Sequence, residues 1–205
     1  EGVPATGFRD IPDGAETKRV CYGSDGAMLY GEQAVGGRWY NFDRVTGAMS
    51  TGLTDIGYKT VLYGEDGAML YGLQQVDGAG ERYFDRATGE LCRGRWVDDA
   101  GTPRRVDADG SLAEGERLVD GRWYWFAPGS EGVASTGFQD IPAGGSATKR
   151  VCYGPDGAML YGEQAIGGHW YNFDRSTGAM STGLTDLGSK TVLYGEDGAM
   201  LYGLQ

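Results

Sequence analysis

Four tryptophans stand at recurring positions and carry the side chains best suited to binding a ligand. Trp39, Trp123 and Trp170 each open a short aromatic run, and Trp125 follows Trp123 by two residues. Side chains two residues apart on a strand point to the same side, so we expect Trp123 and Trp125 to share one face. Aromatic faces attract quaternary ammonium groups and also stack on sugar rings. The chemistry to expect is therefore recognition through ring faces.

Further polar and aromatic residues accompany these tryptophans. The nearby amides are Asn41, Asn172, Gln33 and Gln164. These amides could hydrogen bond to sugar hydroxyls. Equally, they could be solvated side chains that lie beside turns and bind no ligand. Phe138 follows the next Thr-Gly pair after Trp125. We expect Trp123, Trp125 and Phe138 to flank the best groove. Trp39 and Trp170 would mark two weaker and equivalent grooves.

Residues that could catalyse a reaction are explained by internal repetition. The single histidine, His169, is the copy of Arg38, so a catalytic role would require its duplicate to work with arginine. Cys21, Cys92 and Cys152 occupy positions where other repeats carry Leu or Ser, so neither a disulfide framework nor a reactive thiol is expected. Most carboxylates lie in turns, where Asp bonds its own backbone. The sequence predicts no catalytic residue, no metal site and no cofactor.

Composition favours an all-β chain and excludes some partners. The 205 residues include 38 Gly, 13 Tyr, 5 Trp and 6 Phe but only 6 Pro, which is typical of many short strands joined by tight turns. The 18 Lys and Arg against 29 Asp and Glu give a net charge of −11, which disfavours nucleic acid as a partner. No run approaches the roughly 18 apolar residues of a membrane span.

The elements that position these residues are internal repeats. Residues 2–74 return almost unchanged as residues 132–205, and a shorter period of roughly 20 residues runs beneath this duplication. Residues 75–131 keep the period with fewer aromatics, so we expect a divergent middle. The domain organisation predicted is one repeat solenoid over 1–205 with about nine hairpin units. Because the chain starts at Glu1 and stops in mid-pattern at Gln205, we expect a fragment of a longer exported protein.

Each repeat has the plan of a β-hairpin. Asp-Gly and Thr-Gly pairs, such as Asp66-Gly67 and Thr46-Gly47, separate short apolar runs and predict tight turns. Period-two alternation places Tyr40 and Phe42, with their copies, on a core face and Trp39 on the opposite face, toward grooves or solvent. A hairpin this short is unstable alone, so neighbouring hairpins must stack. The methionine that recurs after each turn is expected to pack in the shared spine.

The segments 37–43, 46–52 and 121–126 closely resemble the cell-wall-binding repeats of choline-binding proteins. Similar repeats occur in the glucan-binding repeats of glucansucrases and the repeat domains of clostridial toxins. The resemblance implies an all-β solenoid of stacked short β-hairpins, with choline held by rings between consecutive hairpins. In choline-binding members the first and third residues of the aromatic run supply rings, and we call the third residue the third ring position. Here Asn41 and Asn172 stand at that position. Only Trp123 and Trp125 supply rings at both the first and the third residue of one run. Choline and a glucan-type sugar therefore both stay open as ligands.

The leading hypothesis for function is a non-catalytic surface-attachment module. It would bind a bacterial cell-wall polymer, such as choline-bearing teichoic acid, or an extracellular glycan, and would place its parent protein in the wall of a Gram-positive bacterium. The parent protein could carry a separate catalytic domain. A structural stalk or adhesin scaffold without a small-ligand site is the alternative, and a catalytic domain such as a wall hydrolase is the least favoured reading.

Overall fold

The structure, a computed structural model, describes residues 4–203 and confirms the all-β fold class. Within that range every regular element is a strand, and eighteen strands form nine two-stranded antiparallel sheets. The outermost predicted positions, residues 1–3 and 204–205, lie outside the described residues. In residues 4–203 no helix is long and apolar enough to cross a membrane.

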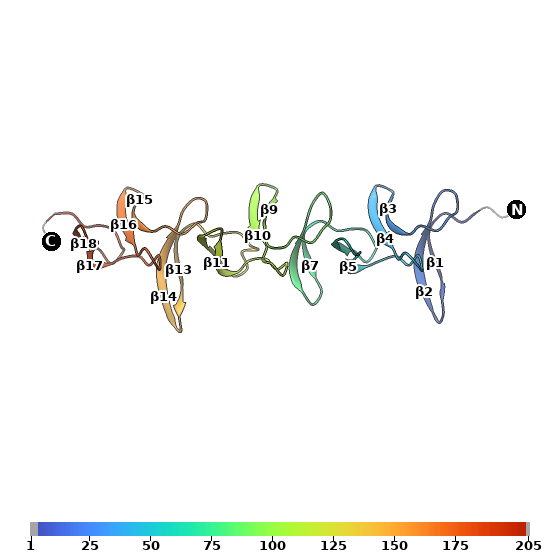
Figure 1. The fold of residues 1–205 in the computed structure, drawn as a ribbon, viewed down its shortest axis with the longest axis horizontal. Coiled ribbons are helices and arrows are strands. Elements are labelled where there is room, and N and C mark those ends of the chain that lie inside the picture. Colours follow the sequence, from blue (N-terminus) through green and yellow to red (C-terminus); the bar gives the residue numbers. More distant parts are fainter. Residues whose placement is uncertain (1–3, 204–205) are drawn as a thin grey trace. The chain divides into compact units, whose positions relative to one another are not determined.

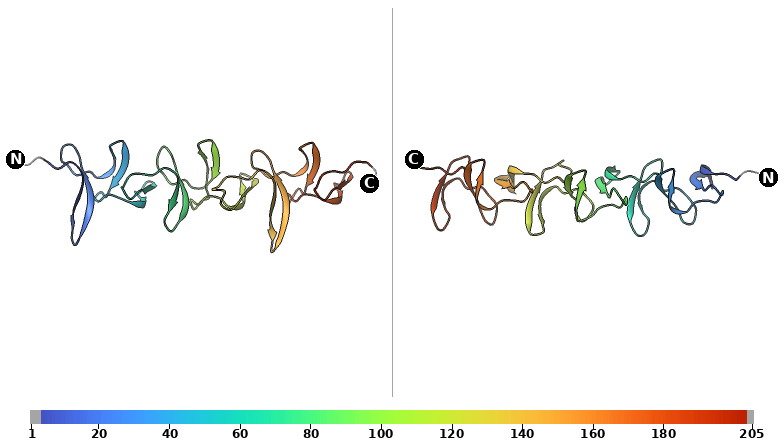
Figure 2. Two further views of the ribbon diagram at one scale, coloured as in Figure 1. Left: turned by 180° about the vertical axis from the view of Figure 1, so that it is seen from behind. Right: turned by 90° about the horizontal axis from the view of Figure 1, so that it is seen from above.

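The chain divides into two compact units. The first comprises Glu1–Gly101 and Arg105–Leu112, and the second comprises Thr102–Arg104 and Ala113–Gln205. The duplicated segments therefore fall one in each unit. Figure 2 shows the same plan of paired strands and turns in both units. The single solenoid over 1–205 stays a prediction.

The first unit carries four complete hairpins (Figure 1). Strand β9 (Trp96–Asp99) and strand β10 (Thr102–Arg105) form a further hairpin, whose residues belong partly to each unit. The strands of the four hairpins are β1 (Gly7–Asp13), β2 (Glu16–Tyr22), β3 (Gly31–Val35), β4 (Arg38–Phe42), β5 (Gly52–Asp55), β6 (Thr60–Tyr63), β7 (Gly72–Val76) and β8 (Gly80–Phe84).

The second unit also carries four complete hairpins. In each of them the first residue of the leading strand pairs with the last residue of the returning strand, as Gly162 does with Phe173. Their strands are β11 (Gly115–Val119), β12 (Arg122–Phe126), β13 (Gly137–Gly144), β14 (Ala147–Tyr153), β15 (Gly162–Ile166), β16 (His169–Phe173), β17 (Gly183–Asp186) and β18 (Thr191–Tyr194).

Turn aspartates hold the chain reversals that follow the returning strands. The Asp43 carboxylate accepts hydrogen bonds from the backbone N–H of Val45 at 3.0 Å and of Thr46 at 2.7 Å. These bonds favour the ionised form and lower the pKa of Asp43. Gly67 has a φ of 78°, and a Cβ there would overlap the side chain of Met49. Glycine is therefore required at this turn for both its conformation and its size.

Successive hairpins are joined by a repeated backbone hydrogen bond from the residue after the turn. The N–H of Met69 donates to the carbonyl of Trp39 at 2.8 Å, and the N–H of Met159 donates to that of Trp123 at 2.8 Å. The same bond recurs in four further pairs: Met49 to Arg19, Met180 to Arg150, Met200 to Trp170, and Leu91 to Thr60. Met69 and Met159 are buried, which confirms the predicted packing role.

The predicted core face is confirmed, but the interpretation of the opposite face is only partly right. The buried core residues on the predicted face include Val20, Tyr40, Phe42, Val61, Tyr63, Tyr124, Phe126, Val151, Tyr153, Phe173 and Tyr194. On the opposite face, expected to meet grooves or solvent, Cys21, Leu62, Tyr83 and Cys152 are also buried. The physical reason is stacking, because an inner hairpin is covered on both sides by its neighbours.

Candidate functional site

Three of the predicted tryptophans are exposed at one repeated position. Trp39, Trp123 and Trp170 are each the second residue of their strand, in β4, β12 and β16. Their exposed fractions are 46%, 38% and 43%. The hydrogen bond between hairpins uses their backbone carbonyls, so the backbone is held while the indole rings remain accessible. The fold thus presents the same aromatic group repeatedly to solvent.

Trp125 and Phe138 lie in more enclosed surroundings. Trp125 is half-buried and packs against the apolar cluster that contains Ile141, Val151, Tyr153 and Met159. The centroid of the Phe138 ring lies 5.0 Å from that of Tyr171 and 6.2 Å from that of Phe173. Phe138 therefore packs against the aromatic residues of β16, whereas Trp125 packs against the apolar core of β13 and β14.

The predicted amides all donate hydrogen bonds within the chain, the asparagines to serines and the glutamines to backbone carbonyls. Asn41 Nδ2 donates to Ser50 Oγ at 2.8 Å, and Asn172 Nδ2 donates to Ser181 Oγ at 2.8 Å. Asn172 is buried, which gives this hydrogen bond a structural role. Gln33 and Gln164 donate to the backbone carbonyls of Tyr30 and Tyr161. Of these amides, Asn172 alone is found in the lining of a cleft described below.

Recurring glutamate–lysine pairs are functional candidates that the sequence interpretation missed. The Glu lies on a leading strand, and the Lys comes from the following hairpin. The pairs are Glu32 with Lys59 at 2.9 Å, Glu116 with Lys149 at 3.3 Å, and Glu163 with Lys190 at 2.7 Å. Each glutamate pairs across its hairpin with the residue at the third ring position. These residues are Asn41 for Glu32, Trp125 for Glu116 and Asn172 for Glu163. The signal was present as a Gly-Glu pair at one repeat position, but only the hairpin register shows what it faces.

The glutamate of the third pair lines an open cleft, which we call the Glu163 cleft. It has a volume of about 930 Å³ and lies where residues of β15 and β16 face the end of β17 and the turn after it. Its lining mixes hydroxyl, amide and charged groups with parts of two rings. The lining residues used below are Tyr161, Glu163, Asn172, Phe173, Ser181 and Ser189.

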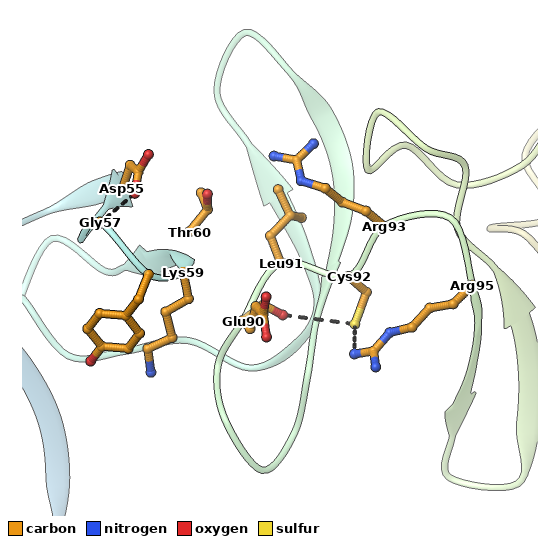
Figure 3. A pocket seen from close by; sticks show the side chains of 10 residues that line it. Asp55, Gly57, Lys59, Thr60, Glu90, Leu91, Cys92, Arg93 and Arg95 are labelled. Atoms are coloured by element: carbon orange, nitrogen blue, oxygen red, sulfur yellow. Dashed lines mark hydrogen bonds between the residues drawn. The ribbon is translucent and has the colours of Figure 1, made fainter.

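A second cleft, in the first unit, surrounds one of the free cysteines. It has a volume of about 460 Å³, and Figure 3 shows Lys59, Glu90 and Arg95 around it. Arg95 Nη2 donates to the sulfur of Cys92 at 2.8 Å (Figure 3). Burial nevertheless raises the pKa of Cys92, so the thiol form is favoured. Across the described range no group of three or more His, Cys, Asp and Glu side chains could hold a metal ion.

The fold relates the chain to solved structures. No protein-family profile matches the chain, and no curated protein matches it either. Choline binding protein F from Streptococcus pneumoniae aligns with a TM-score of 0.69 and 22% identity, over 96% of this chain and 80% of that chain. The choline-binding domain of CbpL from the same organism aligns with a TM-score of 0.69 and 20% identity, over 98% and 100%. The chain shares their fold.

A third structure extends the comparison to a larger protein. The modular autolysin LytC from Streptococcus pneumoniae aligns with a TM-score of 0.56 and 16% identity, over 95% of this chain and 48% of that chain. The resemblance expected from the aromatic segments is therefore confirmed as a common hairpin-repeat fold.

Proposed function

We propose that the chain is a non-catalytic attachment module that binds a polymer of the bacterial cell wall or an extracellular glycan. The observation that carries the proposal is the exposure of Trp39, Trp123 and Trp170 at one repeated position. Large aromatic rings left in solvent at a regular position mark binding surfaces. Choline binding protein F, whose fold is similar, was crystallised in the presence of a peptidoglycan analogue, which supports the same kind of target here.

The chemistry of the ligand follows from rings and charge. Ring faces bind a trimethylammonium group or a sugar face with on the order of 0.5 to 2 kcal/mol per contact. The net charge of −11 repels bare phosphate, so the recognised group is cationic or neutral. Choline on teichoic acid and a glucan-type sugar both satisfy this condition. Several weak grooves acting together on a repetitive polymer would supply the useful affinity.

Among the aromatic grooves, we assign the strongest to Trp123 and Trp125. Both lie on β12, two residues apart, and therefore share one face. Trp123 is exposed and Trp125 is half-buried, and the cross-strand neighbour of Trp123 is the exposed Leu118. Phe138 packs instead against Tyr171 and Phe173 of β16. Trp39 and Trp170 face the smaller cross-strand neighbours Ala34 and Ala165 and mark the weaker grooves.

We assign no reaction to the chain, and any catalytic activity would belong to a separate domain of the parent protein. Its place of action would be the outer surface of a Gram-positive bacterium, where such polymers are found. Co-sedimentation with choline-bearing cell walls and with insoluble glucan tests the proposal. The wild-type chain is expected to sediment with one of these materials. A variant with Trp39→Ala, Trp123→Ala and Trp170→Ala should lose at least about tenfold in apparent affinity, because the sites act together.

The matched control is Val45→Ala, which alters an exposed apolar side chain in a turn. It should sediment like the wild-type chain. Failure of the wild-type chain to bind either material, or equal binding by the triple variant, would contradict the proposal.

A further inference from the structure

The duplicated halves of the chain offer the same site twice, with one informative difference. Around Glu163 the second unit places Asn172, Ser181 and Lys190 in the order in which the first unit places Asn41, Ser50 and Lys59 around Glu32. The amide–serine hydrogen bond and the glutamate–lysine ion pair are present in both copies. The residue before the lysine differs, because it is Tyr58 in the first copy and Ser189 in the second.

In the first copy Tyr58 behaves as a ligand supplied by the chain itself. Its hydroxyl donates a hydrogen bond to Glu32 Oε2. The Nζ atom of Lys59 lies 5.8 Å from the centroid of the Tyr58 ring and 2.9 Å from Glu32 Oε1. The ring itself remains 64% exposed, so it lies over the site from the solvent side. A six-membered ring that bears a hydroxyl is thus held between a carboxylate and an ammonium group.

In the second copy this ring is absent and the site is open. Ser189 lines the Glu163 cleft, together with Asn172 and Ser181. Lys190 Nζ lies 2.7 Å from Glu163 Oε1 and keeps the carboxylate in place. The cleft therefore presents the glutamate, amide and serine that the first copy also has, without the ring that lies over Glu32.

We propose that the Glu163 cleft binds a neutral saccharide ring, with Glu163 accepting a sugar hydroxyl as Glu32 accepts the hydroxyl of Tyr58. The proposal deepens the proposed function, on which it rests, by naming a sugar as the ligand of this cleft. It also assigns Tyr58 as a built-in cover of the equivalent site in the first unit. The residue before the lysine then determines whether a copy of the site accepts an external ligand.

The lining favours a sugar over a quaternary ammonium group. A quaternary ammonium has no hydrogen to donate and needs several exposed ring faces. Here Phe173 is fully buried and Tyr161 is half-buried, while the remaining partners are hydroxyls, an amide and charged groups. The charge of Glu163 is already balanced by Lys190. Sugar hydroxyls can donate to the Glu163 carboxylate and exchange hydrogen bonds with the serine hydroxyls that line the cleft.

A reciprocal exchange of the two residues tests the proposal. The 205-residue chain would be titrated calorimetrically with isomaltotriose, with chitotriose and, as the alternative class of ligand, with choline chloride. Ser189→Tyr should weaken saccharide binding by at least about tenfold, since the new hydroxyl competes for a charge-assisted hydrogen bond. Tyr58→Ser should open the first site and add one saccharide per chain. Both substitutions copy a residue found at the equivalent turn, so unchanged melting temperatures are expected and serve as the folding control.

The outcomes separate this proposal from the proposed function. If neither saccharide binds the wild-type chain, or if Ser189→Tyr leaves saccharide affinity unchanged, the assignment of the cleft is wrong. The assignment would also be wrong if Ser189→Tyr abolished choline binding and left saccharide binding unchanged. An unchanged stoichiometry in Tyr58→Ser would overturn the role of Tyr58 as a cover. In each case wall or glucan binding that depends on Trp39, Trp123 and Trp170 would leave the attachment function standing.

Discussion

The hairpin pairs β3–β6 of the first unit and β15–β18 of the second are near copies that differ at their surfaces. Both keep a fully buried phenylalanine, Phe42 or Phe173, at the end of the returning strand. Both keep an amide bonded to a serine across the turn. They differ where Tyr58 covers Glu32 and Ser189 leaves Glu163 in an open cleft. The comparison teaches that the spine restrains the repeat strictly, while the residues facing the grooves can change one at a time.

The largest effect is expected in the shared spine. Phe42→Ala and Phe173→Ala should each lower the free energy of unfolding of their own unit by about 3 to 5 kcal/mol, because each leaves a cavity at a fully buried position. Urea denaturation followed by tryptophan fluorescence measures the change. Equal losses in the two copies would support the equivalence of the spines. A loss of stability below about 1 kcal/mol in one copy would show that the two spines are not equivalent.

A smaller effect should distinguish the stacking turns from the hairpin tips. Gly67 and Gly57 both have positive φ, 78° and 95°, but only at Gly67 does an added Cβ meet a neighbour, the Met49 side chain. Both alanine substitutions pay a backbone cost of about 1 to 2 kcal/mol. Gly67→Ala should lose a further ~1 kcal/mol or more through overpacking. Thermal denaturation checks the order, and equal losses would show that Met49 moves aside freely.

The smallest effect concerns the turn carboxylates of the two copies. Asp43 and Asp174 both have lowered pKa values, chiefly through hydrogen bonds from Thr46 and from Ser176 and Thr177. Asp174 accepts an additional bond from the Ser176 hydroxyl at 2.7 Å, where the first copy has Val45. A lowered pKa contributes stability above the unfolded value of about 4, and that stability is lost as the pH falls through the folded value.

We therefore expect Asp174 to titrate at lower pH than Asp43 in a carboxyl titration followed by nuclear magnetic resonance. Ser176→Val should bring the two pKa values together, with the Asp43 pKa as the internal control. A pKa of Asp174 equal to or above that of Asp43 in the wild-type chain would contradict the contribution of the hydroxyl.

Much of the fold could be predicted from the sequence because its determinants are local and repeated. Period-two alternation around Asp-Gly and Thr-Gly turns specifies hairpins, and it correctly placed Tyr40, Phe42 and Val61 in the core. Recurrence of methionine after the turn correctly predicted packing, seen at Met69 and Met159. Burial on the face opposite the core face was harder to predict, because the burial of Cys21 and Leu62 depends on the next hairpin.

The sequence by itself determined the strands, the turns, the spine and the repeated tryptophans, since each follows from residues within one repeat. Only the tertiary structure decided which groups meet across hairpins. It joined Glu32 to Lys59 and to Tyr58, and it packed Phe138 against Tyr171. The physical reason is that hydrogen-bond register and stacking offset set these contacts between residues more than twenty positions apart. No periodic pattern encodes that offset, and the open or covered state of each cleft depends on it.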